Sequence, residues 1–502
     1  MKWPAAGALL VLAGLAGCGS QYRPVINPIT KTGPASQPQS LVAVFSQPNL
    51  QQAASLPTNV PPCQRDSSGN ILAYSSPGVV TVLDATGDTV SALATLGNGP
   101  LTFGLDPSGS NAYSENCDGT ISSMAINGSL QTKDVATSTL LPGSAPINAL
   151  IVSTGEYVVE QGDNRIAAMS GSPPSLKVEI TGFAPSLINL TGASTSQRVY
   201  AISQGNSLSP AGDLAWGACA TPSAVSTDGE ADAIEVASNS ISSRIPLGVC
   251  PVYGVSSPNS NRTFILNRGS GTITVINSQL NQLDTVNPNN SPYVIQGTIN
   301  LCSTSTTILP PTTPCNAGPV YADFYSPGNL LVVSNYDNNT VSVIDTSLDV
   351  YGNDSATFGH VLATIPVGSH PAAVSVLQDG SRAYVANEGD GTVTVVSLTS
   401  FTTLSTIPLA PVQNPSDPTN PSDTVLPQPR SIVSNFNFPS GSVFVGAQNS
   451  PYVTVIQTDT DTVAANILVQ GDVVDLRTTT QYAGQTTANS QYQSRSVGSG
   501  AP

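Results

Sequence analysis

The chain repeats one pattern of apolar and polar residues. A short apolar run leads into a polar turn rich in Asn, Asp and Gly, and a run alternating Thr or Ser with Val or Ile follows. Alternation with a period of two buries one face of a strand and exposes the other. Each copy therefore predicts two antiparallel strands joined by a tight turn. Four copies are clear: FILNRGSGTITVINS at 264–278, VVSNYDNNTVSVIDT at 332–346, YVANEGDGTVTVVSL at 384–398 and FVGAQNSPYVTVIQT at 444–458.

Weaker copies fill the rest of the chain. They lie at 72–85, 112–126 and 157–171, and an interrupted copy starts at 199–202 and resumes at 232–236. After each hairpin a further short strand leads to a crossing that ends in proline. Glycine permits a sharp reversal there, and proline fixes φ where no ladder donor is needed. Six crossings carry both residues and end at Pro100, Pro146, Pro185, Pro251, Pro319 and Pro371, whereas the seventh, ending at Pro429, has no glycine.

These elements predict an all-β fold, a β-propeller of four-stranded blades. A hairpin alone cannot hide its apolar face, but neighbouring copies in a ring cover one another. An inner strand, a hairpin, an outer strand and a crossing are the parts of one blade. Eight hairpin segments and seven crossings predict eight blades, with seven as the alternative if one weak copy is an appendage. The propeller is expected to span residues 41–478, closed by an inner strand from 41–46 or from 472–478.

Three short motifs connect this pattern to a known family. Tyr-Val-Ala-Asn at 384–387, Thr-Val-Thr-Val at 392–395 and Val-Gly-Ser-His-Pro at 367–371 resemble the YVTN-family β-propeller repeat. The resemblance is close over 252–470 and diluted over 71–251. It implies a cell-surface or envelope protein without an assigned reaction. Related propellers include lactonases and quinoprotein-like enzymes, so the fold alone does not exclude catalysis.

The N-terminus predicts export and lipidation. Lys2 precedes an apolar stretch at 5–16 that is too short to span a bilayer. Leu-Ala-Gly-Cys at 15–18 then resembles the bacterial lipobox, which implies removal of residues 1–17 and a lipid anchor on Cys18. An ordinary secretory signal with a chance cysteine is the alternative. Gly19 and Ser20 lack an aspartate retention signal, which favours the outer membrane in a cell with two membranes. No later segment is long and apolar enough to span a membrane.

Composition narrows the partners and the flanking segments. The net charge is −16 with only 15 Lys and Arg, which argues against binding of nucleic acid through phosphates and against a basic patch for anionic lipids. Residues 18–40 contain four prolines and are expected to be a flexible tether. Residues 479–502 are rich in Gln, Ser and Gly and are expected to be a disordered tail. We therefore expect a membrane-tethered envelope protein.

The seven cysteines fit an oxidising compartment. With Cys18 assigned to lipid, six cysteines remain and suggest three disulfides. Nearness in sequence favours Cys302–Cys315 and Cys219–Cys250, which leaves Cys63 to pair with Cys117. Metal binding is the rival interpretation, but the chain has no CxxC spacing and no cluster of histidines.

Candidate catalytic residues are few. Histidine is the natural general base near neutral pH, and the chain has only two, His360 and His370. We expect His360 at the surface and His370 in a crossing near one end of the central channel, where propeller ligands bind. Sister crossings hold Gly, Ala, Cys or Gln at the position of His370, which favours a structural role. No Gly-x-Ser-x-Gly elbow supports a Ser-His-Asp triad, no CxxCH motif supports an electron-transfer quinoprotein, and no cofactor is predicted.

Polar residues that recur in the repeat are expected to be structural. Asn and Asp favour turns because they hydrogen-bond the local backbone and tolerate left-handed conformations. We assign this role to the residues that follow the second strand of their blades, in preference to a lactonase-type metal site: Glu115, Glu160, Asn267, Asn335 and Asn387. Two acidic groups that could bind calcium lack EF-hand spacing: Asp228, Glu230, Asp232 and Glu235 in one, and Asp459 and Asp461 in the other.

Insertions into the blades are better candidates for binding than single residues. They lie at 203–229, 288–315, 350–359 and 411–429, and loops of this kind usually carry binding functions. Trp216, in the first insertion, is a plausible contact residue together with His370. The leading hypothesis is a lipid-anchored, non-catalytic module that binds or scaffolds a protein or glycan partner. The alternative is a lactonase-like envelope hydrolase with its site at the channel mouth near His370.

Overall fold

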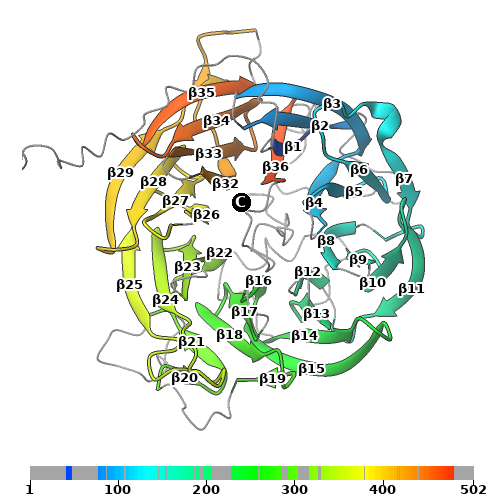
Figure 1. Cartoon of the computed structure of the whole chain (residues 1–502), viewed down its shortest axis with the longest axis vertical. Helices are drawn as coiled ribbons and strands as arrows, with labels where there is room; N and C mark the ends of the chain where they lie inside the picture. Colours follow the sequence, from blue (N-terminus) through cyan, green and yellow to red (C-terminus); the bar gives the residue numbers. More distant parts are fainter. Residues whose placement is uncertain are drawn as a thin grey trace, which may run out of the picture.

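The protein is an all-β propeller with eight blades arranged around one axis (Figure 1). The structure is a computed structural model. It describes residues 41–47, 77–85, 88–106, 109–144, 146–152, 155–184, 187–192, 197–205, 228–257, 261–284, 292–302, 316–325, 329–377, 379–414, 417, 419–437 and 440–479. Among these residues no helix has the length and apolarity needed to cross a bilayer.

The strands of each blade run from the innermost, at the axis, to the outermost. Blade 1 consists of β36 (Asp472–Thr478), β1 (Leu41–Gln47), β2 (Pro77–Asp84) and β3 (Thr89–Asn98). Blade 2 consists of β4 (Pro100–Leu105), β5 (Asn111–Asn116), β6 (Thr120–Ala125) and β7 (Ala136–Thr139), with the 3₁₀ helix η1 (Thr132–Asp134) before β7. Blade 3 consists of β8 (Pro146–Val152), β9 (Gly155–Glu160), β10 (Arg165–Ser170) and β11 (Ser175–Thr181). Blade 4 consists of β12 (Leu187–Thr191), β13 (Arg198–Ser203), β14 (Asp228–Glu235) and β15 (Ser240–Val249).

Blades 5 to 8 follow the same order. Blade 5 begins with β16 (Pro251–Ser256), β17 (Arg262–Asn267) and β18 (Thr272–Asn277). Its outer part is irregular: β18 pairs with both β19 (Gln282–Leu283) and β21 (Thr298–Asn300). A further short strand, β20 (Val294–Ile295), pairs with β21. Blade 6 consists of β22 (Pro319–Tyr325), β23 (Leu330–Asn335), β24 (Thr340–Asp345) and β25 (Val361–Pro366). Blade 7 consists of β26 (Pro371–Val376), β27 (Arg382–Asn387), β28 (Thr392–Ser397) and β29 (Thr402–Pro408). Blade 8 consists of β32 (Pro429–Asn437), β33 (Ser440–Ala447), β34 (Tyr452–Gln457) and β35 (Thr462–Leu468), and the loop before it holds the small sheet of β30 (Val412–Gln413) and β31 (Thr424–Val425).

The ring closes without a gap. Each innermost strand contacts the innermost strand of the next blade, from β4 through β8, β12, β16, β22, β26 and β32 to β36, and β36 returns to β4. Eight blades are therefore confirmed against the alternative of seven. Both candidate closing segments are used: residues 472–478 form the innermost strand of blade 1, and β1 is the second strand, paired with β36 on one side and β2 on the other.

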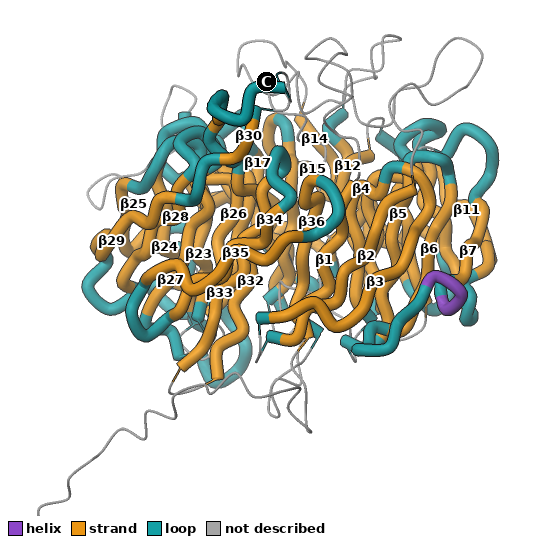
Figure 2. The backbone as a smooth tube through the Cα atoms, turned by 90° about the horizontal axis from the view of Figure 1, so that it is seen from above, coloured by secondary structure: helices purple, strands orange, loops and turns teal. Residues whose placement is uncertain are grey.

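The two ends of the propeller differ in their connections (Figure 2). One end, called the crossing face, carries the crossings between blades, the turns between second and third strands, and the sheet of β30 and β31. The other end, called the Leu41 face, carries the turns between third and fourth strands. Second strands begin at this end, so β1 enters the ring at the Leu41 face, and the backbone N–H of Thr479 donates to the carbonyl of Leu41 at 2.9 Å.

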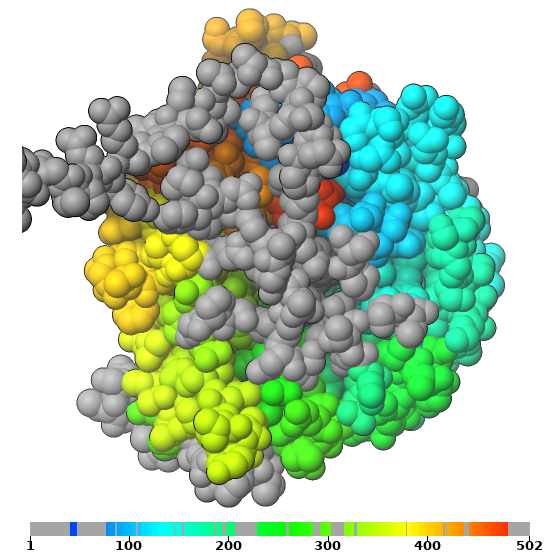
Figure 3. Space-filling model, viewed as in Figure 1, coloured from blue at the N-terminus to red at the C-terminus, as the bar shows by residue number. Residues whose placement is uncertain are grey.

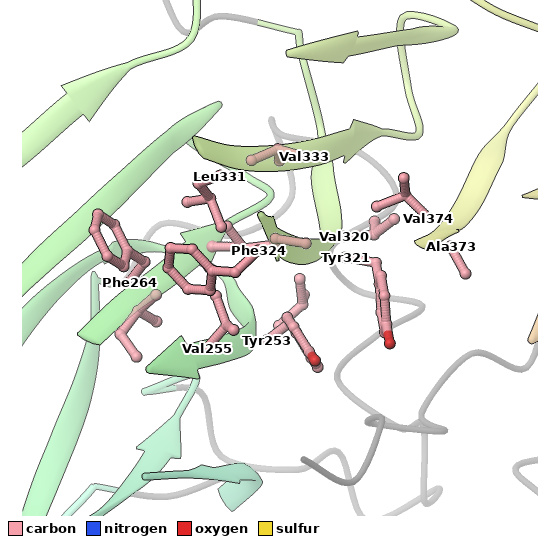
Figure 4. Packing of buried hydrophobic residues seen from close by; sticks show 14 of the residues in the cluster. Tyr253, Val255, Phe264, Val320, Tyr321, Phe324, Leu331, Val333, Ala373 and Val374 are labelled. Atoms are coloured by element: carbon pink, nitrogen blue, oxygen red, sulfur yellow. The ribbon is translucent and has the colours of Figure 1, made fainter. Parts of the chain in front are cut away.

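Apolar side chains fill the space between blades. Phe45 of blade 1 stacks on Phe103 of blade 2, with ring centroids 3.8 Å apart. Phe264 of blade 5 packs edge-on against Phe324 of blade 6 at 5.6 Å (Figure 4). Both faces of each sheet are covered in this way, which explains why the alternating residues of third strands such as β24 are buried on both sides.

One buried asparagine joins the second and third strands in several blades. At the last residue of the second strand, its Nδ2 donates to two hydroxyls of the third strand. In blade 7, Asn387 donates to Thr392 at 2.9 Å and to Thr394 at 2.8 Å. The equivalent residues are Asn116, Asn267 and Asn335. The structural role is confirmed for Asn267, Asn335 and Asn387, but the expected partner was wrong: these bonds go to side chains, not to the local backbone.

Glu115 does not lie at this position. It is one residue too early, and Asn116 holds the position instead. Glu160 is the last residue of the second strand in blade 3, so it does lie at this position. On the third strand of that blade, Arg165 and Ala167 stand where other blades have Ser or Thr. In five blades the turn behaves as expected, because it has a residue with positive φ: Gly119, Asn164, Gly271, Asn339 and Gly391. The turn of blade 8 at 448–451 has none.

Replacing the asparagine should destabilise a blade. Asn387→Ala leaves the Thr392 and Thr394 hydroxyls without their amide donor, and we expect a loss of about 1–3 kcal/mol in the free energy of unfolding. Chemical denaturation measures this loss. Asn338→Ala is the control, because Asn338 lies in an exposed turn and should change stability much less. Equal losses for both variants would contradict the assigned role.

Candidate functional site

The innermost strands present a ring of buried side chains at one level. In seven of them the register shifts just after the first residue or two, where the strand bulges. A bulge re-aims the side chains next to it. The residues just after the shift hold equivalent places around the axis, and all are buried: Thr102, Asn148, Asn189, Tyr253, Tyr321, Ala373 and Ser431.

Side chains on these strands also accept hydrogen bonds from backbone N–H groups on the innermost strand of the next blade. Asn148 Oδ1 accepts the backbone N–H of Leu190 at 2.9 Å. Asp323 Oδ2 accepts the N–H of Val376 at 2.8 Å. An innermost strand has no neighbour on its axial side, and buried N–H groups need partners. The axis is therefore a connected polar wall and not a row of open strand edges.

Five residues gather on this wall from three blades and are called the axial cluster: Tyr253, Tyr321, Asp323, Asp475 and Arg477. Tyr253 and Tyr321 stack with ring centroids 4.8 Å apart. Figure 4 shows both hydroxyl groups pointing to the same side, away from the aliphatic side chains. Arg477 comes from β36, which lies across the ring from β16, and its Nη2 lies 3.0 Å from Asp475 Oδ2.

Burial controls the protonation of the axial cluster. It raises the pKa of Tyr253 well above its usual range, and the positive charge of Arg477 offsets part of this effect. Burial likewise raises the pKa of Asp323 to about 7, again against the lowering effect of Arg477. Near neutral pH the cluster therefore offers phenol hydroxyls, a guanidinium and the Asp323 carboxyl, whose pKa lies close to the pH of the solution. These groups can bind a polar ligand.

A second polar layer lies at the crossing face. In four blades the residue after the second strand reaches the next blade. Gln161 Nε2 donates to the carbonyl of Leu187 at 3.3 Å, and Gln204 Nε2 donates to that of Pro251 at 3.1 Å. After the second strands of blades 5 and 7, ion pairs make the contact with the next blade. Arg268 pairs with Asp337 at 2.7 Å, and Glu388 pairs with Arg430.

His370 lies on this layer. Its ring stacks on Tyr336 at 4.7 Å, and the Arg268 guanidinium carbon lies 5.0 Å from the centroid of the same tyrosine. His370 Nδ1 is 3.3 Å from Ser369 Oγ, and its backbone N–H donates to Asn339 Oδ1 at 2.8 Å. The structure thus places His370 at the crossing face, as the sequence predicts, in contact with an aromatic ring and a hydroxyl.

Position 370 demands a left-handed backbone. His370 has φ of 52°, and sister crossings at Gly99, Cys250 and Gly318 have φ of 66°, 54° and 61°. Glycine adopts this conformation without steric cost, whereas for other residues it costs about 1–2 kcal/mol. The backbone therefore does not explain why a histidine is present at this position, and its ring contact with Tyr336 is the remaining structural reason.

Two substitutions separate the ring contact from the backbone strain. His370→Ala removes the ring but keeps the strained φ, whereas His370→Gly removes both. We expect the glycine variant to unfold with a free energy about 1 kcal/mol higher than the alanine variant. Urea denaturation of the two variants measures this difference. Equal stabilities would show that φ at this position carries no cost.

The other predicted site residues do not converge with His370. His360 lies on the Leu41 face, where its ring stacks on Tyr293 at 4.1 Å. In the suspected calcium clusters, Glu230 pairs with Arg244 at 2.8 Å, and Asp461 pairs with Arg382 at 2.6 Å. Asp232 Oδ2 accepts the N–H of Phe183 at 2.9 Å. Within the described ranges, no group of three or more His, Cys, Asp or Glu side chains is placed to hold a metal ion.

Several predicted residues lie outside the described residues: Cys18, Cys63, Trp216, Cys219 and Cys315. The signal at 1–17, the tether at 18–40 and the tail after Thr479 lie there too. Cys117, Cys250 and Cys302 are disulfide-bonded. Because their three expected partners are not described, the connectivity stays a prediction.

The axial cluster is the feature that the sequence analysis missed. A usable signal exists, because Tyr253 and Tyr321 each stand two residues after the proline that ends a crossing. Crossing prolines mark the start of innermost strands, so the side chains that follow them share one level at the axis. Arg477 and Asp475 carry no such mark, since no proline begins β36.

No family model matches the chain, and no curated protein matches it. Solved structures share its fold. The structure of apo AztD from Citrobacter koseri superposes with a TM-score of 0.53 at 12% identity, covering 88% of this chain and 98% of that one. A second structure of Citrobacter koseri AztD gives a TM-score of 0.51 at 13% identity, with the same coverage of both chains. At this identity the likeness supports the propeller fold alone.

Proposed function

We propose that this protein is a lipid-anchored β-propeller of the cell envelope that binds a protein or glycan partner without catalysing a reaction. One observation supports the non-catalytic part: three arginines at the crossing face and at the axis are each paired with a carboxylate. Arg268 pairs with Asp337, Arg430 with Glu388, and Arg477 with Asp475. The two histidines lie on opposite faces, so they cannot act on one substrate.

The crossing face of blades 6 and 7 is the proposed binding surface. It exposes the ring of His370 and the side chains of Asp337, Asn338 and Asn339. Beneath them, Tyr336, Arg268 and Glu388 are buried and held by hydrogen bonds and ion pairs. A rigid layer below exposed polar groups lowers the ordering cost of binding. A planar ring beside amides and a carboxylate suits either a glycan or a polar protein surface.

The lipid anchor is proposed from the sequence around Cys18. Leu-Ala-Gly-Cys at 15–18 resembles a lipobox, and an outer-membrane location follows if the cell has two membranes. Metabolic labelling with an alkyne fatty acid tests this part directly. Labelled wild-type protein and unlabelled Cys18→Ser protein are expected.

Capture from envelope extracts tests the binding function. Immobilised wild-type protein should retain a specific protein or glycan, and the double variant Asn338→Ala, His370→Gly should lose most of it. The control is Leu404→Ser, an exposed site on the outer strand β29. Deletion of 206–227, which keeps β13 and β14 intact, tests the insertion that carries Trp216. Turnover of lactone or ester substrates that depends on His370 would replace this proposal with the hydrolase alternative.

A further inference from the structure

The loop between β24 and β25 displays apolar side chains to solvent. Val350 is 92% exposed and Tyr351 is 86% exposed. The loop joins a third strand to a fourth strand, so it lies on the Leu41 face. Residues near 350 form a yellow-green patch on the face viewed in Figure 3.

The tip of this loop has a defined conformation. Asp349 Oδ1 accepts the backbone N–H of Tyr351 at 2.8 Å and that of Asn353 at 2.9 Å. The N–H of Asp349 donates to the carbonyl of Asn353 at 2.7 Å, and that of Gly352 donates to the carbonyl of Asp349 at 3.1 Å. Gly352 takes a φ of 82°. Local bonds therefore hold Val350 and Tyr351 outwards.

The base of the loop is clamped to blade 5. Buried Asp354 pairs with Arg262 at 2.8 Å, and Arg262 also pairs with Asp284 at 2.6 Å. Phe358 is fully buried, with its ring 6.1 Å from that of Phe264. A loop anchored in this way presents its tip at a fixed height above the blades, which a loosely attached loop would not do.

A third apolar side chain lies beside the tip. Leu280 is 60% exposed in the turn that follows β18 of blade 5. The neighbouring Gln279 donates from Nε2 to Asn261 Oδ1 at 2.7 Å. A Cβ placed on Gly352 would lie 4.0 Å from Asn261 Nδ2. Asn261 therefore lies beside both segments, so Leu280, Val350 and Tyr351 project from neighbouring loops of the same face. These three residues are called the apolar prominence.

The chain reaches the ring at this same face. β1 begins at Leu41, on the Leu41 face, and 22 residues separate Leu41 from Cys18. A chain of that length spans at most about 80 Å. A lipid on Cys18 would therefore keep the point at which the chain enters the ring within that distance of the membrane, and the apolar prominence lies on the same face as this point.

We propose that Leu280, Val350 and Tyr351 contact the lipid surface and orient the propeller with its Leu41 face towards the membrane. The inference rests on the proposed anchor at Cys18. Tyrosine suits this place, because its ring is apolar and its hydroxyl can remain among headgroups. The net charge of −16 and the pairing of Arg262 disfavour attraction to anionic lipid. The surface recognised is thus a zwitterionic one, entered by apolar side chains to about 5–10 Å.

Fluorescence quenching by lipid tests this contact. Tyr351→Trp protein, lipidated at Cys18 and reconstituted in phosphatidylcholine vesicles, should lose tryptophan emission when the acyl chains carry bromine near the headgroup. Leu404→Trp is the matched control, because Leu404 is also exposed but lies on the outer strand β29. The emission of this control should be quenched no more than that of the parent protein, whose mature chain contains Trp216.

A second arm separates the tip from the anchor. A hexahistidine tag replaces Cys18 and attaches the Tyr351→Trp protein to vesicles with nickel-chelating lipid. Quenching of the introduced tryptophan in this arm, abolished by adding Val350→Ser and Leu280→Ser, supports the contact even if Cys18 carries no lipid in cells. Absence of quenching in both arms, with the protein bound to the vesicles, overturns it. Crosslinking of the loop tip to an envelope protein in place of quenching would likewise overturn it, because the prominence would then serve a protein partner.

Discussion

A chain that ends at Gly471 should lose its cooperative unfolding transition. The truncation removes β36, the innermost strand of blade 1. On one side β36 contacts β32 of blade 8, and on the other side it contacts β4 of blade 2. Leu476 and Val473 would leave the apolar core between blades 8 and 1. Losing a buried leucine alone costs about 2–5 kcal/mol, and β1 would also lose its hydrogen-bonded neighbour. The total rivals the stability of an ordinary domain.

A second truncation controls for the loss of the tail. A chain ending at Thr479 keeps β36 and the bond between Thr479 and Leu41, so it should melt like the full chain. Circular dichroism and near-ultraviolet spectra during heating compare the three proteins. If the chain ending at Gly471 melts at the temperature of the chain ending at Thr479, closure by β36 contributes nothing to stability.

Stability should fall as the pH rises from about 4 to about 8. Burial raises the pKa of Glu156 to about 8, and burial also raises those of Asp323 and Asp472 to about 7. A carboxyl whose pKa is raised by folding binds its proton more tightly in the folded state. The stability that such a carboxyl contributes is fully present below its pKa in the unfolded chain, near 4. It is lost as the pH rises past the pKa of the same carboxyl in the folded protein. The protein should therefore unfold more easily at pH 8 than at pH 5.

Glu156 offers the sharpest single test. Both of its carboxylate oxygens are buried without a hydrogen-bond partner in the described part of the chain. A rise from 4.5 to about 8 corresponds to about 5 kcal/mol at roughly 1.4 kcal/mol per pH unit. Glu156→Gln removes this pH-linked penalty, so its denaturation midpoint should change less with pH.

The control for this test is Asp459→Asn, at an exposed turn residue. It should keep the pH dependence of the parent protein, whereas Glu156→Gln should exceed the parent in stability at pH 8. Urea denaturation at half-unit intervals of pH separates the variants. A stability that rises between pH 5 and pH 8, or an unchanged slope for Glu156→Gln, would contradict the burial of an ionisable carboxyl at this position.

The sequence predicted the blades well because their signals are local. Alternation in segments such as 392–395 predicts a strand without knowledge of the rest of the chain, and a proline such as Pro371 marks a crossing by its own geometry. The choice between residues 41–46 and 472–478 is not local. Both segments are apolar enough to be buried strands, and only the closed ring shows that they pair with each other.

The axial cluster was missed for the same reason. Tyr253, Tyr321 and Arg477 come from β16, β22 and β36, and the charge of Arg477 acts on the two tyrosines only when the ring is complete. Nothing in the sequence near Arg477 indicates that its charge acts on Tyr253. His370 was placed correctly because its crossing motif is local, but its contact with Tyr336 comes from the neighbouring blade.

This chain forms a closed ring of eight blades that β36 completes. An experimental density map viewed along the axis is the sharpest check on this arrangement. We expect eight sheets around the axis, with residues 472–478 innermost in the first sheet and residues 41–47 beside them. Seven sheets, an open arc, or residues 472–478 away from residues 41–47 would contradict it.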